Sequence, residues 1–126
     1  MMRLFIVDDS DILRSRIIES LSDIKGVSIV GEARNAREAI EAAEQLDPDA
    51  VILDIRLPGG NGISIIDAIR KLRKKQPKII VFTNYPYLQY RKKCIDAGAD
   101  YFFFKALEFE RLIDLVRRLA KKYLSN

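Results

Sequence analysis

The apolar residues of this chain occur in two alternating patterns. Short, almost uninterrupted apolar runs are typical of buried strands, whereas apolar residues spaced three or four apart are typical of helices with one buried face. The first pattern predicts strands at residues 3–8, 27–33, 50–54, 79–83 and 100–104. The second predicts a helix after each of these strands, so the chain consists of five strand–helix pairs.

Local signals set the expected ends of the helices. The first helix is expected at residues 11–24. Asn35 can cap the second, and the Asp47-Pro48 pair should end it, because a residue before proline disfavours the helical conformation. The third follows the sequence LPGGNG, the fourth lies near residues 87–97 before Gly98, and the fifth ends the chain. Helical residues expected to face the core include Ile17, Leu21, Ala39, Ile40, Ala43, Ile65, Ile66, Ile69, Leu72, Leu112 and Val116.

Strict alternation of strands and helices predicts a parallel sheet with helices on both faces, which is a three-layer, doubly wound α/β domain. The crossovers are expected to be right-handed. Residues 1–126, of which 48% are hydrophobic, are long enough to form one domain with a full core. In such sheets ligands bind beyond the carboxyl ends of the strands, so polar residues at those ends are the first candidates for a site.

Composition excludes several classes of protein. The apolar runs are too short to span a membrane, and the N-terminus has no signal-peptide pattern. A single cysteine, Cys94, excludes an internal disulfide and fits a reducing compartment, so we expect a cytoplasmic protein without membrane insertion. Cys94 itself is best explained as a small buried residue. The absence of histidine excludes histidine acid–base chemistry and histidine metal ligands.

Polar residues occur where the predicted strands end. Asp8 and Asp9 end the first strand, Asp54 ends the third, Thr83 ends the fourth, and Lys105 follows the fifth. Clustered carboxylates repel one another, and Mg²⁺ relieves the repulsion because it prefers carboxylate oxygens and keeps several waters. A carboxylate beside a metal ion, an ammonium group and a hydroxyl suits phosphoryl transfer, with the carboxylate itself as a nucleophile.

These residues, with the sequence DIRLPGGNG from Asp54 onward and the Thr83-Asn84 pair, resemble the receiver domain of bacterial two-component response regulators. The resemblance covers essentially the whole chain, and all four blocks occur in the same order and with the same spacing. It implies a flavodoxin-like fold with strand order 2-1-3-4-5. It also implies a signalling switch that catalyses its own phosphorylation and dephosphorylation but is not a turnover enzyme.

The resemblance implies a role for each site residue. Asp54 is the implied phosphoacceptor, and it also contributes to the metal site. Asp9 is implied to bind Mg²⁺ directly, Asp8 mainly through water, and Arg56 through its backbone carbonyl. Lys105 is implied to contact the phosphoryl oxygens.

Two further pairs of residues concern switching and lifetime. The resemblance implies that Thr83 moves toward the phosphoryl group while Phe102, three residues before Lys105, turns inward. Arg56 and Tyr85 lie two residues beyond Asp54 and Thr83, at positions that tune dephosphorylation in similar proteins. A long cation and a bulky aromatic ring at these positions lead us to expect slow self-dephosphorylation.

The implied phosphodonor is a sensor histidine kinase or a histidine phosphotransfer protein. The surface of the fourth helix, fifth strand and fifth helix is implied to change on phosphorylation and to bind a second copy or a protein target. Basic residues cluster late in the third helix, in the fourth and in the last, and tyrosines flank the second cluster. They are Arg70, Lys71, Arg73, Lys74, Lys75, Arg91, Lys92, Lys93, Arg117, Arg118, Lys121 and Lys122, with Tyr85, Tyr87 and Tyr90. A solvated surface or partner docking explains them better than a stacking platform for nucleic acid, so no nucleic-acid partner is expected.

One departure from the family pattern concerns the loop after Lys105. The family usually has a proline there, often with a cis bond, whereas this chain has Ala106. A cis bond to alanine costs about 2.5–4 kcal/mol. We therefore expect either a trans bond with a rerouted loop or an unusual constraint.

Two other functional classes fit part of the pattern. A receiver-shaped interaction module that works without phosphorylation is disfavoured by the intact acidic and lysine set. A metal-dependent phosphatase of the haloacid-dehalogenase kind would place a second aspartate two residues after the nucleophile. Arg56 occupies that position in this chain.

Overall fold

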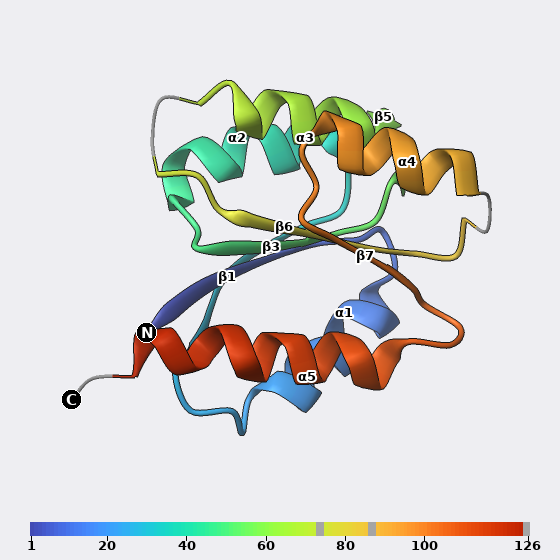
Figure 1. The fold of residues 1–126 in the computed structure, drawn as a ribbon. Coiled ribbons are helices and arrows are strands. Elements are labelled where there is room, and N and C mark those ends of the chain that lie inside the picture. Colours follow the sequence, from blue (N-terminus) through green and yellow to red (C-terminus); the bar gives the residue numbers. More distant parts are fainter. Residues whose placement is uncertain (73–74, 86–87, 125–126) are drawn as a thin grey trace.

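The computed structural model describes residues 1–72, 75–85 and 88–124. Its main sheet has five parallel strands in the order β2-β1-β3-β6-β7, which is the predicted order 2-1-3-4-5 (Figure 1). The strands are β1 (Met2–Val7), β2 (Val27–Ala33), β3 (Ala50–Leu53), β6 (Lys78–Thr83) and β7 (Tyr101–Phe104). The fold class predicted from the sequence is thus confirmed.

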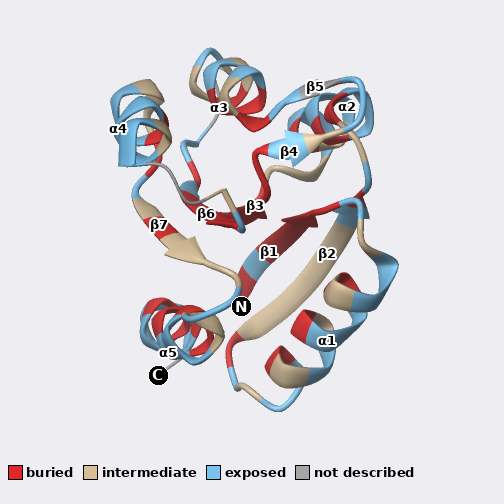
Figure 2. Cartoon of the chain, turned by 90° about the vertical axis from the view of Figure 1, so that its right-hand side faces the viewer, coloured by how far each residue is buried: buried red, intermediate tan, exposed pale blue. Residues whose placement is uncertain are grey.

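Helices cover both faces of this sheet. They are α1 (Asp11–Leu21), α2 (Ala36–Leu46), α3 (Gly62–Arg70), α4 (Leu88–Ala97) and α5 (Phe109–Ala120), followed by the 3₁₀ helix η1 (Lys121–Tyr123). Helices α2, α3 and α4 pack on one face, and α1 and α5 pack on the other (Figures 1 and 2). Within the described residues no helix is long and apolar enough to cross a membrane.

Local signals placed several helix ends correctly. The Asn35 side chain accepts a hydrogen bond from the Glu38 amide and caps α2, and Asp47 ends that helix in the left-handed conformation. Gly98 follows α4 with a φ of 120°, a value that favours glycine. The prediction that the fourth helix begins at Tyr87 lies outside the described residues.

Three predicted details of the helices are wrong. Helix α1 ends at Leu21 rather than at residue 24, and α3 ends at Arg70, so the partly buried Leu72 lies beyond the helix. Ile40 is 37% exposed, although its spacing predicted a core position. The buried face of α2 consists of Ala36, Ala39 and Ala43 instead, and these small side chains allow close packing on the sheet.

The loop after β3 contains regular secondary structure. Strands β4 (Arg56–Leu57) and β5 (Gly60–Asn61) form a short antiparallel ladder. The Gly62 amide then donates to the Ile55 carbonyl at 2.8 Å, and a Cβ on Gly62 would lie 2.4 Å from the Ile55 Cα. Only glycine permits this close approach, which folds the loop back beside the end of β3.

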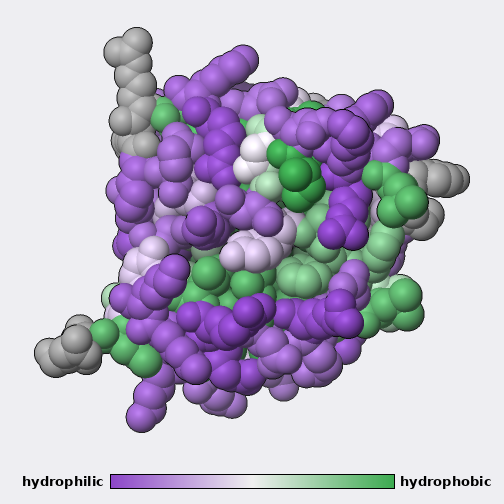
Figure 3. All heavy atoms as spheres, in the orientation of Figure 1, coloured by the Kyte–Doolittle hydropathy of each residue, from purple (hydrophilic) through white to green (hydrophobic). Residues whose placement is uncertain are grey.

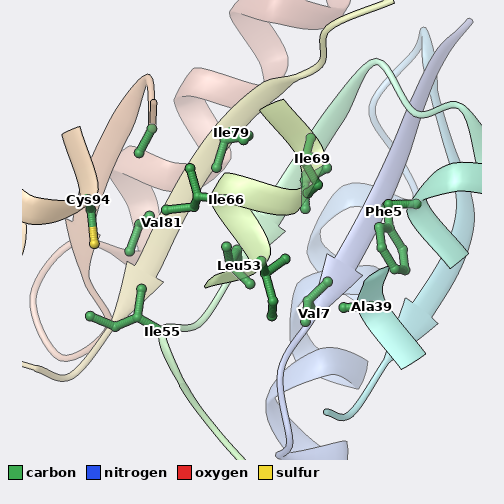
Figure 4. Close-up of a cluster of buried hydrophobic side chains, with 14 of the residues drawn as sticks. Phe5, Val7, Ala39, Leu53, Ile55, Ile66, Ile69, Ile79, Val81 and Cys94 are labelled. Carbon is green, nitrogen blue, oxygen red and sulfur yellow. The ribbon is translucent and has the colours of Figure 1, made fainter. Parts of the chain in front are cut away.

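The core has two halves because alternate strand residues face opposite sides of the sheet. In β1, Phe5 and Val7 belong to the half beneath α2, α3 and α4, whereas Leu4 and Ile6 belong to the half beneath α1 and α5. Figure 4 shows the first half, where Ile66 from α3 lies close to the strands. Burial on both faces explains why the central strands are almost uninterrupted apolar runs.

Native Cys94 is expected to react with iodoacetamide about a hundredfold more slowly than the unfolded chain near pH 8, where an exposed thiol with a pKa of about 8.5 is partly ionised. The side chain is fully buried in the first half of the core, and burial raises the pKa of this thiol to about 11. Intact mass after timed alkylation, with and without guanidinium chloride, measures both rates. Equal rates would contradict this assignment.

Candidate functional site

The polar strand ends meet at one edge of the sheet, as predicted. Figure 2 views the molecule from this edge. Asp8 follows β1, Asp54 follows β3, Thr83 ends β6, and Lys105 follows β7. Backbone hydrogen bonds fix these residues relative to one another: the Asp54 amide donates to the Val7 carbonyl, and the Lys105 amide donates to the Thr83 carbonyl, each at 2.9 Å.

The Asp54 carboxylate lies at the centre of the site and is buried. Its Oδ1 accepts hydrogen bonds from the Thr83 hydroxyl at 2.8 Å and from the Arg56 amide at 3.1 Å. Its Oδ2 accepts from Lys105 Nζ at 2.7 Å. Three donors from three different elements thus fix the orientation of one carboxylate.

Lys105 bridges two buried carboxylates. Its Nζ lies 2.7 Å from Asp54 Oδ2 and 2.6 Å from Asp8 Oδ2. Burial raises the pKa of the Asp8 carboxyl, although its hydrogen bond to Lys105 limits the rise. Burial alone would lower the pKa of Lys105, but the hydrogen bonds to Asp54 and Asp8 outweigh it and raise this pKa above its ordinary value. The lysine therefore carries a firmly held proton.

Asp8, Asp9 and Asp54 are close enough to share a cation. One carboxylate oxygen from each lies within 4.8 Å of those of the other two. Asp9 is exposed, whereas Asp8 and Asp54 are buried, so an ion would reach this group from the solvent on the Asp9 side. Hard carboxylate oxygens with room for water suit Mg²⁺. The donor set thus fits the metal that the sequence predicted.

A pocket of about 640 Å³ opens beside these residues. Asp54, Thr83 and Lys105 lie at its polar end, and Leu57, Pro58, Asn61, Ile63 and Tyr90 contribute to its walls. The Arg56 guanidinium lies 5.2 Å from the centre of the Tyr85 ring, and that ring lies 4.1 Å from the Tyr90 ring. The two residues predicted to tune dephosphorylation thus contact each other on one wall.

Both residues predicted to act in switching lie inward in this structure. Thr83 is fully buried and donates its hydroxyl to Asp54. Phe102 is 8% exposed, belongs to the core beneath α4, and packs edge-on against Phe104 with ring centres 5.7 Å apart. Both side chains thus lie inward, and Thr83 contacts Asp54 directly.

Sequence reasoning missed Arg14, a buried cation beside the site. Its guanidinium donates to the Asp8 carbonyl, to the Asp11 carboxylate and, at 3.0 Å, to Glu32 in β2. It thereby ties the loop that carries Asp8 and Asp9 to the neighbouring strand. One signal could have revealed it, because position 14 shares the buried face of α1 with Ile17, where a charged residue is unexpected.

The fold and this site define a flavodoxin-like α/β domain with an acidic group, a threonine and a lysine at its strand ends. The family described as "Response regulator receiver domain" matches residues 4–117. The chain therefore belongs to the receiver domains of two-component response regulators. This membership removes the support for the phosphatase alternative.

Similar proteins agree with this family. The response regulator GacA of Pseudomonas aeruginosa is 31% identical over 99% of this chain and 59% of its own length. The nitrate/nitrite response regulator NarL of Escherichia coli is 32% identical over 93% of this chain and 54% of its own length. The chain thus spans little more than half the length of these curated relatives.

Solved structures show the same fold. The signal receiver domain of the putative response regulator NarL from Mycobacterium tuberculosis has a TM-score of 0.85 and 25% identity, covering 95% of this chain and 96% of that one. The isolated receiver domain of RcsB from Salmonella enterica, solved with the phosphomimetic BeF₃⁻, has a TM-score of 0.85 and 28% identity, covering 95% and 88%.

Proposed function

We propose that residues 1–126 form a phosphorylation-dependent receiver whose phosphoacceptor is Asp54. The observation that carries this proposal is the buried Asp54 carboxylate, which is hydrogen-bonded to Lys105 and Thr83. Asp8 and Asp9 lie beside it. In this proposal Asp54 is the nucleophile, Lys105 and Thr83 are the cationic and hydroxyl donors, and the aspartates are the metal ligands; the pocket lined by Asp9, Asp54, Thr83 and Lys105 supports it.

Each side chain has a distinct task in the proposed reaction. An Asp54 oxygen attacks the phosphorus atom of the donor, and the bond from phosphorus to the donor breaks. Lys105 and Thr83 then turn their donors to the phosphoryl oxygens, where negative charge is concentrated. Bound Mg²⁺ supplies further positive charge there. We assign it to Asp8, Asp9, Asp54 and the backbone carbonyl of Arg56.

Residues 1–126 contain no histidine, so the phosphoryl group must come from a histidine outside these residues. A sensor histidine kinase or a histidine phosphotransfer protein is the proposed partner. In the phosphorylated state, the side chains of Thr83 and Phe102 keep the inward positions that they have in this structure. Arg56 and Tyr85, stacked beside the pocket, restrict the approach of water and slow the loss of the phosphoryl group.

Intact mass tests the proposal directly. The protein is incubated with Mg²⁺ and phosphoramidate, quenched, and weighed over time. A receiver gains one phosphoryl group, and EDTA prevents the gain. A protein that binds partners without phosphorylation gains none, which would leave the interaction module as the function of this fold.

The proposed output surface consists of α4, β7 and α5. Figure 3 shows hydrophobic residues in a band between hydrophilic side chains on this side of the molecule. A groove of about 580 Å³ on it is lined by Phe103 and charged residues of α5 and η1. These are Arg111, Asp114, Arg117, Arg118 and Lys121. The predicted basic residues Arg73 and Lys74 lie outside the described residues. Because basic side chains outnumber acidic ones in the lining of this groove, an acidic surface on the partner would complement it best.

Binding to this surface is expected to weaken as salt rises, because exposed charges are screened beyond about 10 Å at 0.1 M ionic strength. A synthetic peptide that combines glutamates with one aromatic residue serves as the probe, titrated onto phosphorylated protein at low and high salt. Arg118→Glu should weaken binding at low salt only. Affinity that stays constant with salt, or that ignores this substitution, would count against an acidic partner.

A further inference from the structure

The loop after Lys105 lacks apolar anchoring. Ala106 and Leu107 are both exposed, and every described peptide bond, including the one before Ala106, is trans. The trans bond, one of the two alternatives expected from the sequence, is therefore present. The conformation of the loop must be fixed by hydrogen bonds, because no buried side chain between Lys105 and Glu108 fixes it.

Glu108 makes these hydrogen bonds. Its carboxylate Oε1 accepts from the Phe104 amide at 3.0 Å, while its own amide donates to the Phe104 carbonyl at 2.9 Å. Both backbone groups of Phe104, the residue before Lys105, are thus bound to one residue. The Lys105 amide is bound to the Thr83 carbonyl at 2.9 Å. The backbone that carries the Lys105 side chain is held on both sides.

Strand geometry explains why Phe104 needs such a partner. Successive amides of a strand point to opposite sides, and β7 is an edge strand that pairs only with β6 among the described strands. Since the Lys105 amide points to β6, the Phe104 amide points to the open edge. A partly buried amide without an acceptor is costly, and the Glu108 carboxylate supplies that acceptor.

Helix capping does not explain this glutamate. Glu108 occupies the N-cap position of α5 but makes no side-chain cap hydrogen bond, and glutamate is not among the preferred capping residues. Its carboxylate instead reaches back four residues, and its second oxygen lies 3.4 Å from Arg111. A negative charge beside a helix N-terminus is favourable in any case, so the competing explanation for Glu108 is its charge rather than its hydrogen bond to Phe104.

We infer that Glu108 is a positioning residue for Lys105, which it orients by clamping the Phe104 backbone with its carboxylate. The clamp sets the direction from which Nζ reaches Asp54 and Asp8, 2.7 and 2.6 Å away. This inference rests on the proposed phosphoacceptor role for its kinetic consequence, but the clamp itself can be measured without phosphorylation.

The test compares Glu108→Gln, Glu108→Asp and Glu108→Ala. Glutamine keeps an acceptor of the same length without the charge. Aspartate keeps the charge and is a better N-cap, but it is too short to reach Phe104. Glu110→Ala is the matched control, because it removes an exposed acid from the first turn of α5 and leaves the clamp intact.

Three kinds of measurement are made on each variant. Hydrogen exchange followed by NMR reports protection of the Phe104 amide, with the Ile80 amide of β6 as the reference for global unfolding. Labelling by phosphoramidate reports the rate of phosphoryl transfer, and thermal shifts report Mg²⁺ binding. A displacement of about 1 Å costs up to about a hundredfold in rate, so a loosened lysine should cost about tenfold.

We expect Glu108→Asp and Glu108→Ala to lose protection of the Phe104 amide and to label about tenfold more slowly than the wild type, with Mg²⁺ binding retained. Glu108→Gln and Glu110→Ala should match the wild type. If Glu108→Gln behaves as Glu108→Ala does, or if Phe104 stays protected in Glu108→Asp, the inference is wrong. Wild-type protein that is never labelled would overturn the proposed function, while amide exchange would still decide the clamp.

Discussion

We expect Asp54→Asn to abolish phosphoryl labelling and to leave the fold intact. The amide side chain is not a nucleophile, so no covalent bond to phosphorus can form at this position. Asparagine can still accept from the Thr83 hydroxyl and the Arg56 amide with its oxygen. Lys105 keeps its ion pair with Asp8. The expected result is an intact mass that does not change with phosphoramidate and Mg²⁺, together with native circular dichroism.

Asp49→Asn is the matched control for this substitution. Asp49 is also a buried carboxylate next to β3, but it precedes the strand, where it accepts from the Arg3 amide and pairs with Lys75. Asp49→Asn should lower the free energy of unfolding, while phosphoryl labelling of the variant continues at the wild-type rate. Labelling of Asp54→Asn at the wild-type rate would place the phosphoacceptor elsewhere, and peptide mapping would then locate it.

Lys105→Met should destabilise the metal-free protein and increase the stabilisation that Mg²⁺ provides. Lys105 lies between the carboxylates of Asp8 and Asp54, and the three side chains are 13%, 3% and 7% exposed. Removing one partner of a buried ion pair costs about 3–5 kcal/mol, because the remaining charge is left unpaired. The same substitution removes the ammonium group that would compete with Mg²⁺ for the carboxylates of Asp8 and Asp54. Thermal melts with EDTA and with Mg²⁺ measure both effects.

The two effects have opposite signs, so a general loss of packing cannot produce them together. Lys92→Met serves as the control, because Lys92 forms an exposed ion pair with Asp96 at 3.1 Å. Such pairs contribute about 0.2–1 kcal/mol, so this variant should melt close to the wild type. The bridging role would be refuted if Lys105→Met had the same melting temperature as Lys92→Met in EDTA. It would also be refuted if Mg²⁺ raised the melting temperature of Lys105→Met no more than that of the wild type.

The sequence predicted the site through one geometric rule. Asp8, Asp54, Thr83 and Lys105 are distant along the chain, but each lies at or just after a strand end, and the carboxyl ends of parallel strands share one edge. No knowledge of side-chain contacts was needed to bring them together. Strand positions were predictable for a similar reason, since burial on both faces leaves continuous apolar runs.

Features set by side-chain reach were not predictable. The spacing of Ile40 fits a helical core stripe, but alanines determine how closely α2 approaches the sheet. Arg14 and Glu108 act through hydrogen bonds to backbone groups of other residues, and no periodic pattern encodes such bonds. Composition alone suggested repulsion between the aspartates, whereas the structure pairs two of them with Lys105.

The order in which the site residues occur along the chain has a consequence for biosynthesis. Lys105 lies 51 residues after Asp54, beyond the last strand of the sheet. A nascent chain that has emerged only as far as β6 carries the carboxylates and the threonine but lacks the ammonium group. Under the proposed function, Asp54 gains its Lys105 contact only once β7 has docked, so we expect that unfinished copies are not phosphorylated. The same separation makes the domain suitable for fragment complementation, in which two separately expressed pieces regain labelling only when they reassemble.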